Sequence, residues 1–111
     1  MVRVDSLKKR YIAFRLNSSI TDPEKLKRSI YAEALKFFGE FGLSEAALKL
    51  HSYDSKTKIG ILRCERSYLE RVLGFLALVS SLDGTEARLV ALKSSGTLKS
   101  LESTTESTHL A

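Results

Sequence analysis

The sequence contains few of the residues that mark secreted, disulfide-bonded or membrane-spanning proteins. Among its 111 residues there are one cysteine, one proline and no tryptophan. Because a single cysteine, Cys64, cannot form an intramolecular disulfide, we expect the fold to rest on its apolar core in a reducing compartment. The longest largely apolar stretch, residues 72–79, is too short to cross a bilayer, and no apolar run follows the first charged residues as in a signal peptide. We therefore expect an intracellular, cytoplasmic protein.

The sequence also lacks the residue combinations that catalysis or metal binding requires. Its two histidines, His51 and His109, have no partner His, Cys or carboxylate at metal-ligand spacing. Cys64 ends an expected central strand, where a cysteine is usually a small buried apolar residue rather than a nucleophile. The glycines form no phosphate-binding loop. We therefore expect no catalytic residues, no metal and no cofactor in this chain.

The sequence does have an excess of positive charge. Lysine and arginine number 18 against 13 acidic residues, which gives a formal net charge of +5 and an isoelectric point near 9.5. Such a surplus is typical of proteins that contact phosphates, because a polyanion releases its counterions to clustered cations. A globular protein that is basic by chance explains the charge equally well. The apolar content of 43% is ordinary for a folded soluble domain.

The hydrophobic pattern predicts one folded domain, residues 10–101, between a basic N-terminal arm at 1–9 and a polar tail at 102–111. We expect the tail to be disordered. Alternation of apolar and polar residues predicts strands at residues 10–17 and 47–53. A β-rich run predicts a third strand at 58–64, and a fourth is expected at 86–93. With helices between them, these strands predict an α+β protein of the ferredoxin-like split βαβ type (β-α-β-β-α-β). Its four-stranded antiparallel sheet would carry two helices on one face.

Two amphipathic helices are predicted between the strands. The first, residues 23–41, begins after an N-cap that is either Asp22 or Thr21 and ends at a left-handed cap on Gly42. Its expected apolar stripe consists of Leu26, Ile30, Ala34, Phe37 or Phe38, and Phe41. The second helix ends at the stop signal Asp83-Gly84, and its stripe consists of Leu69, Val72, Leu73, Leu76 and Val79. After the last strand, the sequence TLKSL predicts a short helical turn.

The sheet face opposite the helices is expected to carry both apolar and basic side chains. If Ile12, Phe14 and Leu16 face the helices, the other face shows Tyr11, Ala13, Arg15, Ile59, Ile61 and Arg63. A partner or the chain's own C-terminal turn would cover such a strip, although a central strand that is simply apolar on both sides explains it equally well. Base stacking of the kind seen in RNA-recognition motifs is not expected, because the third strand has no aromatic residue.

Basic residues form two clusters, one at the end of the arm and one around the predicted edge where the third and fourth strands end. With the turn that follows the fourth strand, they are the candidate RNA-backbone contacts: Lys8, Lys9, Arg10, Arg63, Arg66, Lys93, Ser95, Gly96, Thr97 and Lys99. Gly96 is expected to take a positive φ that turns neighbouring amides toward an anion. Solvated surface charge is the alternative for each residue, and for Arg66 a helix pair with Glu70.

Four segments are specific when they occur together in this order: RYIAF at 10–14, KTKIGILRCERSYLERV at 56–72, LVSSLDG at 78–84 and SSGTLKSL at 94–101. They resemble protein component 2 of archaeal ribonuclease P, a family shared with eukaryotic ribonuclease P and RNase MRP. The resemblance implies a ferredoxin-like fold with added helical turns. It also implies a non-catalytic subunit that binds and stabilises the catalytic RNA of an endoribonuclease, which matures the 5′ end of precursor tRNA.

The resemblance also implies partners for the chain: the ribonuclease P RNA, protein component 3, other ribonuclease P proteins and a second copy of itself. The residues we expect at a protein interface are Tyr11, Arg15, Ile59 and Ile61. A hypothesis of a different class is a small ferredoxin-like ligand-binding or oligomerisation module with incidental charge. Binding that weakens steeply with salt would favour RNA over a small-molecule ligand.

Overall fold

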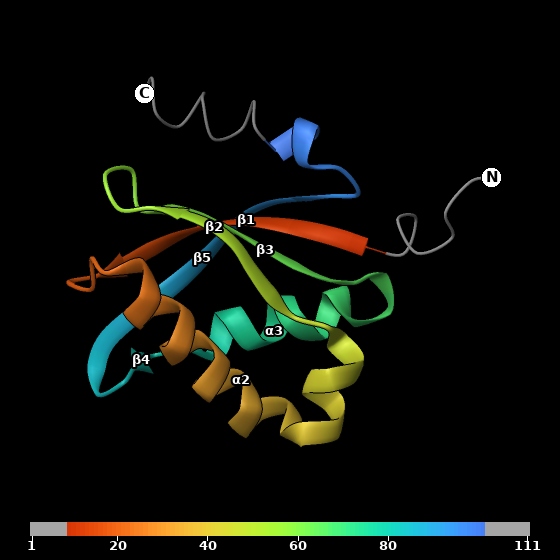
Figure 1. Cartoon of the computed structure of the whole chain (residues 1–111), viewed down its shortest axis with the longest axis horizontal. Coiled ribbons are helices and arrows are strands. Elements are labelled where there is room, and N and C mark those ends of the chain that lie inside the picture. The colour runs from red at the N-terminus through yellow and green to blue at the C-terminus, as the bar shows by residue number, and fades with distance from the viewer. Residues whose placement is uncertain (1–8, 102–111) are drawn as a thin grey trace.

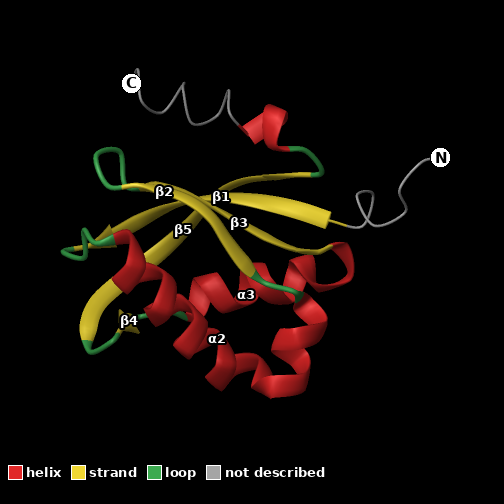
Figure 2. Ribbon diagram, in the orientation of Figure 1, coloured by secondary structure: helices red, strands yellow, loops and turns green. Residues whose placement is uncertain are grey.

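Strand β1 (Lys9–Ser18) runs through the interior of an antiparallel sheet in the computed structural model, which describes residues 9–101 (Figure 1). The sheet has five strands in the order β2-β3-β1-β5-β4. The other elements are α2 (Pro23–Ala46), β2 (Lys49–Asp54), β3 (Ile59–Glu65), the 3-10 turn η1 (Arg66–Tyr68), α3 (Leu69–Leu78), β4 (Ser81–Leu82) and β5 (Thr85–Ser95). Helices α2 and α3 cover one face of the sheet (Figure 2), which we call the inner face.

The α+β class, the order of the long strands and the two helices on one face agree with the sequence prediction, but the expected count of four strands was wrong. The short fifth strand, β4, pairs with the start of β5. Asp83 and Gly84, expected to stop a helix, instead form the tight turn of this hairpin with φ of 52° and 76°. Two consecutive positive φ angles suit the twist of a two-residue hairpin, and Asp-Gly tolerates them. Helix α3 therefore ends earlier, at Leu78.

Helix α2 begins as predicted but ends later than predicted. The side chain of Asp22 accepts a hydrogen bond from the amide of Glu24 at 3.1 Å, which selects Asp22 over Thr21 as the N-cap. The helix does not stop at Gly42. It bends at Gly39, whose φ of 76° and ψ of 170° are not helical, and continues to a left-handed cap at Ala47. Glycine is the residue that adopts such a φ without a steric penalty.

The inner face carries the main core, in which β1 contributes Ile12, Phe14 and Leu16. The first turns of α2 follow the predicted stripe and bury Leu26, Ile30 and Ala34. The stripe continues as predicted to Phe38, which is partly buried against the core. Beyond the bend at Gly39 the prediction was wrong, since the side chain of Phe41 is 78% exposed.

Helix α3 buries Val72 and Leu76 as predicted, with Val79 just beyond its end, whereas Leu69 and Leu73 are only partly buried. Phe75, which the predicted stripe omitted, is also buried and packs against the ring of Phe38. Neither helix in the described part of the chain has both the length and the apolar character that spanning a bilayer demands.

A second, smaller cluster lies on the opposite face of the sheet, which we call the outer face. A helical turn at residues 98–101, here called the C-terminal turn, lies over this face (Figure 1). Its Leu101 is buried together with Ala13 and Ile61, and Tyr11, Leu92 and Leu98 pack around them. The chain's own C-terminal turn, one of the alternatives left open by the sequence, therefore covers this apolar strip.

Candidate nucleic-acid interface

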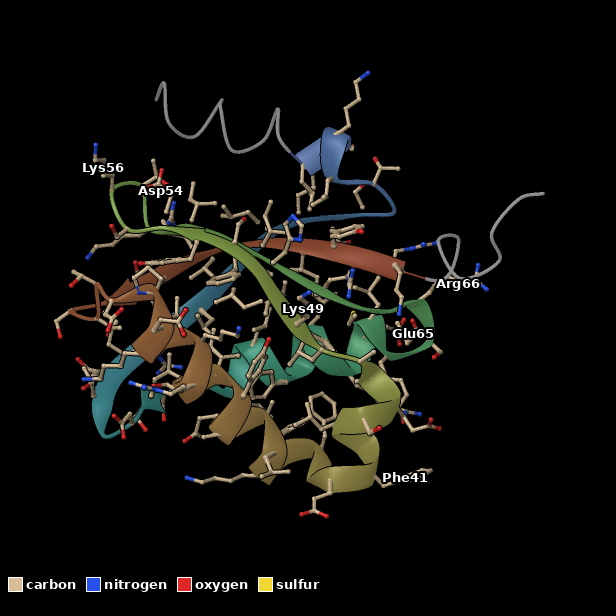
Figure 3. All side chains as sticks on the ribbon, viewed as in Figure 1. Phe41, Lys49, Asp54, Lys56, Glu65 and Arg66 are labelled. Atoms are coloured by element: carbon tan, nitrogen blue, oxygen red, sulfur yellow. The ribbon has the colours of Figure 1, made fainter. Side chains whose placement is uncertain are left out.

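Three strand ends meet at one end of the sheet, where most of the predicted RNA contacts were expected. Tyr11 on β1 lies directly opposite Arg63 on β3 and opposite Ser95 on β5. Because β1 is antiparallel to both neighbours, its beginning lies beside the last residues of β3 and β5. The 3-10 turn that starts at Arg66 follows β3 immediately, and Figure 3 shows Arg66 beside Glu65 at this end. We call Arg10, Arg63, Arg66 and residues 95–97 the basic end of the sheet.

Arg10 connects the basic N-terminal cluster to the turn after β5. A Cβ atom placed on Gly96 would lie 3.3 Å from a terminal nitrogen of the Arg10 guanidinium, so the arginine lies against the glycine. The predicted positive φ at Gly96 was wrong, since the positive-φ glycines among the described residues are Gly39 and Gly84. The role of Gly96 is therefore to leave room for the Arg10 side chain. Without a positive φ at Gly96, the neighbouring amides are not turned toward an anion in the way that was predicted.

The hydroxyl groups of this turn have structural partners. The amide of Thr97 donates to Oγ of Ser95 at 3.2 Å, and the amide of Ser100 donates to Oγ1 of Thr97 at 3.4 Å. Thr97 thus caps the C-terminal turn. In both contacts the hydroxyl oxygen is the acceptor, so each O–H remains able to donate to an oxygen of another molecule. The turn therefore keeps two hydroxyl donors beside Arg10.

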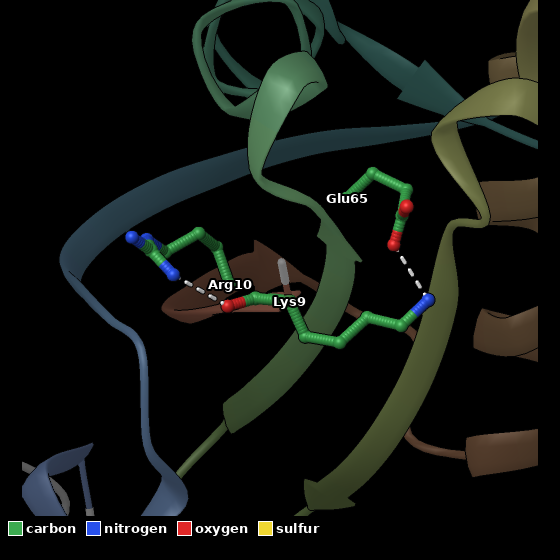
Figure 4. A network of polar contacts seen from close by, with 3 residues as sticks. All are labelled: Lys9, Arg10 and Glu65. Carbon is green, nitrogen blue, oxygen red and sulfur yellow. Dashed lines mark hydrogen bonds and ion pairs between the residues drawn. The ribbon is translucent and has the colours of Figure 1, made fainter. Parts of the chain in front are cut away.

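Lys9 is less available than the prediction assumed. Its Nζ lies 2.6 Å from Oε2 of Glu65, the residue opposite it on β3 (Figure 4). The contact is a close ion pair without the angles of a hydrogen bond. Arg10 donates to the carbonyl of Lys9 at 2.8 Å, which fixes the start of β1. Lys8 lies outside the described residues.

The remaining predicted cations differ in their surroundings. Arg66, Lys93 and Lys99 are exposed. Within the described residues Arg66 forms no ion pair with Glu70, so the helix pair considered as its alternative role is not formed. Lys93 lies opposite Ala13, farther from the end of the sheet than Ser95. Lys99 belongs to the C-terminal turn.

Arg63 and Lys49 face each other across β3 and β2. Arg63 is partly buried, and its Nε has no hydrogen-bond partner in the part of the chain that the structure describes. Lys49, labelled in Figure 3, is exposed at the start of β2. Sequence reasoning did not select Lys49, because the register that places it beside Arg63 depends on the β-bulge between Leu50 and Ser52.

His51 is the other residue of this region that was not predicted as an RNA contact. It lies within this bulge on the edge strand β2, and its ring meets that of Tyr11 edge-on, with centroids 6.1 Å apart. Simple alternation along the strand does not locate a bulge, so the pairing of these two rings had no signal in the sequence.

Cys64 is fully buried at the end of β3, in agreement with its prediction as a small core residue. Burial, with a smaller contribution from the charge of Glu65, raises the pKa of its thiol to about 11. At neutral pH the thiol is therefore protonated and a poor nucleophile.

The four residues expected at a protein interface are not equally accessible. Arg15 is exposed, while Tyr11 is partly buried beneath the C-terminal turn. Ile59 and Ile61 are only 3% and 8% exposed in the single chain. A partner that used Ile61 would therefore have to displace Leu101, which packs on it. Their role at an interface stays a prediction.

Comparison with known proteins gives matches over nearly the whole described chain. Residues 10–105 match the Rpp14/Pop5 family. Ribonuclease P protein component 2 of Pyrococcus furiosus is 36% identical over 96 residues, covering 86% of this chain and 80% of that protein. The protein of the same name from Archaeoglobus fulgidus is 34% identical over 93 residues, covering 83% of each chain.

The fold has a counterpart among solved structures. A chain in the cryo-EM structure of yeast ribonuclease MRP is similar with a TM-score of 0.62, covering 94% of this chain and 93% of that one at 14% identity. At that identity the likeness concerns the fold alone. The sequence match, in contrast, extends from the start of β1 to beyond the C-terminal turn and includes both ends of the sheet. This chain therefore belongs to the Rpp14/Pop5 family.

Proposed function

We propose that this chain is a non-catalytic protein subunit of ribonuclease P, which binds and stabilises the catalytic RNA that matures the 5′ end of precursor tRNA. The proposal rests on membership of the Rpp14/Pop5 family, whose archaeal members cited above are named ribonuclease P protein component 2. In this proposal the active site belongs to the RNA, and the chain contributes positively charged surface. Its partners are the RNA, protein component 3, other ribonuclease P proteins and, by self-association, a second copy.

The observation that carries RNA binding is the convergence of cationic and hydroxyl groups at the basic end of the sheet. Arg10, Arg63 and Arg66 come from three elements that are joined by strand pairing or chain continuity, so their positions are fixed relative to one another. Ser95 and Thr97 add hydroxyl donors at the same end. Phosphate oxygens along an RNA backbone accept hydrogen bonds from all of these groups.

Copurification tests the proposal directly. Tagged full-length protein recovered from its own cell extract should carry one structured RNA in stoichiometric amount, together with other protein subunits. The isolated chain should not cleave precursor tRNA unless that RNA is added. Recovery without RNA, or cleavage by the protein alone, would contradict the proposed role.

Salt dependence tests two arginines of the basic end and two nearby lysines, one residue at a time. Each of Arg63→Ala, Arg66→Ala, Lys93→Ala and Lys99→Ala should lower the slope of log affinity against log salt by about one if the cation contacts phosphate. Lys56→Ala is the matched control, since Lys56 is an exposed lysine in the β2–β3 turn at the other end of the sheet (Figure 3). Slopes identical to that of Lys56→Ala in all four variants would show that none of these four cations contacts phosphate.

For the protein interface, Arg15→Glu is a sharper test than a change at Ile61. Arg15 is exposed, so the charge reversal leaves the core intact, whereas a polar residue at Ile61 would disturb the packing of Leu101. We expect Arg15→Glu to weaken copurification with protein component 3 or with a second copy. A variant that assembles normally would remove Arg15 from the interface.

A further inference from the structure

The outer face carries an aromatic pair that spans a strand. Tyr11 on β1 and His51 on β2 have ring centroids 6.1 Å apart at an interplanar angle of 79°. Because β3 lies between these strands, their backbones are two strand spacings, about 9–10 Å, apart. Both side chains must therefore lean toward each other across β3. His51 remains exposed, so this pair presents an aromatic ring to solvent beside the basic end of the sheet.

The strand between the two rings carries Arg63, one of whose guanidinium nitrogens has no acceptor among the described residues. Arg63 lies opposite Tyr11 on one side and opposite Lys49 on the other. Its Nε is buried and has no hydrogen-bond partner within residues 9–101. A buried donor of a charged group is normally satisfied, and leaving it unpaired costs free energy. Within residues 9–101, Nε of Arg63 is therefore a donor that lacks an acceptor.

The charges around Arg63 increase this imbalance. Lys49 and Arg63 are like charges directly opposite each other on paired strands, an arrangement that destabilises a sheet. The carboxylate two residues farther along β3, that of Glu65, already has Lys9 at 2.6 Å. An anion from another molecule, placed beside Lys49 and Arg63, would relieve the repulsion between the two cations.

We propose that His51, Tyr11, Arg63 and Lys49 form a binding site for one unpaired nucleotide of RNA. The base stacks on the imidazole of His51, which the ring of Tyr11 holds in place, and Arg63 and Lys49 bind the adjoining phosphate. This inference rests on the proposed RNA-binding function and names the kind of RNA segment that the outer face takes. Stacking on aromatic rings with cations along the backbone is how proteins hold single strands.

The C-terminal turn limits the site to a single base. Ala13 and Ile61, the next positions along the outer face, are covered by Leu101 and Leu98. The strands therefore offer no second open ring beside His51, in contrast to a sheet that stacks several bases. Ser95, which belongs to the basic end, lies on the other side of Tyr11. In this proposal the RNA backbone therefore continues from the bound nucleotide toward the basic end.

The test uses the full-length chain with a short fluorescein-labelled single-stranded RNA and an RNA duplex of the same length. His51→Ala should weaken binding of the single strand at least about fivefold, because one stacked base is lost, without changing the salt slope. His51→Phe, which keeps a ring, should restore it. Lys49→Ala should lower the salt slope by about one. Duplex affinity should be the same for His51→Ala as for the parent protein.

Phe41→Ala is the matched control, because it also removes an exposed aromatic ring, but on the helical side of the molecule (Figure 3). Equal single-strand affinities for His51→Ala, Phe41→Ala and the parent would overturn the site while leaving RNA binding intact. Failure of the parent to bind either RNA would instead contradict the proposed function. If His51→Ala keeps its RNA affinity and loses a copurifying protein subunit, the site belongs to a protein partner and the nucleotide proposal is wrong.

Discussion

At the scale of single residues, Gly60 shows how closely the sheet and its core are packed. A Cβ atom at this position would lie 2.6 and 2.8 Å from ring carbons of Phe14 and 3.0 Å from the carbonyl oxygen of Ser52. Phe14 is fully buried between β1 and the helices, so it has little room to move. The absence of a side chain at Gly60 therefore leaves the room that the Phe14 ring occupies beside β3.

We expect Gly60→Ala to lower the free energy of unfolding by about 1–3 kcal/mol, the usual cost of overfilling a packed core. Gly74→Ala is the control, since Gly74 lies in α3 with nothing within 4 Å of the added Cβ. Because alanine favours the helix, that variant should gain about 0.5–1 kcal/mol. Urea unfolding of both proteins measures the difference, and equal stabilities would contradict this account of Gly60.

Cys64 gives the protein a predictable response to alkaline pH. The folded thiol has its pKa raised from 9.0 to about 11, chiefly by burial, so the unfolded chain loses this proton first as the pH rises. The free energy of unfolding should therefore fall between about pH 9 and pH 11, by about 1.4 kcal/mol per pH unit at most from this group. Cys64→Ala should fall less steeply in denaturant titrations over this range. Parallel curves would show that Cys64 does not contribute.

At the scale of secondary structure elements, the N-terminus of α2 depends on one side chain. Asp22→Ala should destabilise the protein by about 0.5–2 kcal/mol, because the amide of Glu24 loses its acceptor. Thr21→Ala is a close control, as Thr21 is the exposed neighbour that the sequence offered as an equal N-cap. Thermal unfolding of both variants decides between them, and a larger loss for Thr21→Ala would reverse the assignment.

The elements also show where sequence reasoning succeeds and where it stops. Alternation and β-rich runs located β1, the β2–β3 hairpin and β5, because each of these strands packs apolar side chains on the core of the inner face. Periodicity held on α2 as far as Phe38 and failed at Phe41, because the helix bends at Gly39 and Phe41 is exposed. It also misread Asp83-Gly84, since the same dipeptide ends a helix or forms a hairpin turn, depending on whether strand residues flank it on both sides.

The candidate interface was predictable only in part. Sequence order and strand direction brought Arg10, Arg63 and the turn after β5 to one end of the sheet. The ion pair that occupies Lys9 and the contact between Arg10 and Gly96 depend on the register of β1 with its neighbours. The meeting of His51 with Tyr11 depends on a bulge. Register and bulges are set by packing of the whole sheet, which local patterns do not contain.

At the scale of the whole molecule, the two faces of the sheet are closed by different means. The inner face is buried by two helices, whereas the outer face is closed by the short C-terminal turn, whose Leu101 is fully buried. Removing this side chain should expose Ala13 and Ile61 together. The outer cluster is therefore the part of the core that depends most on a single residue.

Leu101→Ala should lower the free energy of unfolding by about 2 kcal/mol, near the lower end for a buried leucine because the turn can partly collapse onto the gap. Backbone amides of residues 98–101 should also exchange with solvent faster. Leu78→Ala, which changes a leucine that is 69% exposed, is the control and should have an effect below about 0.5 kcal/mol. Equal losses in the two variants would mean that Leu101 does not hold the turn in place.

The interior position of β1 has a consequence for how the protein is made. Its two neighbours are β3, which follows after helix α2 and strand β2, and β5, the last strand of the sheet. A ribosome synthesises β1 first and the C-terminal turn long afterwards, so a nascent chain holds β1 without its second neighbour and the outer face without its cover. Long-range pairings of this kind form slowly and leave apolar surface and strand edges open until they are complete. Chaperone contact during synthesis is therefore expected to end only after residues 98–101 have left the exit tunnel.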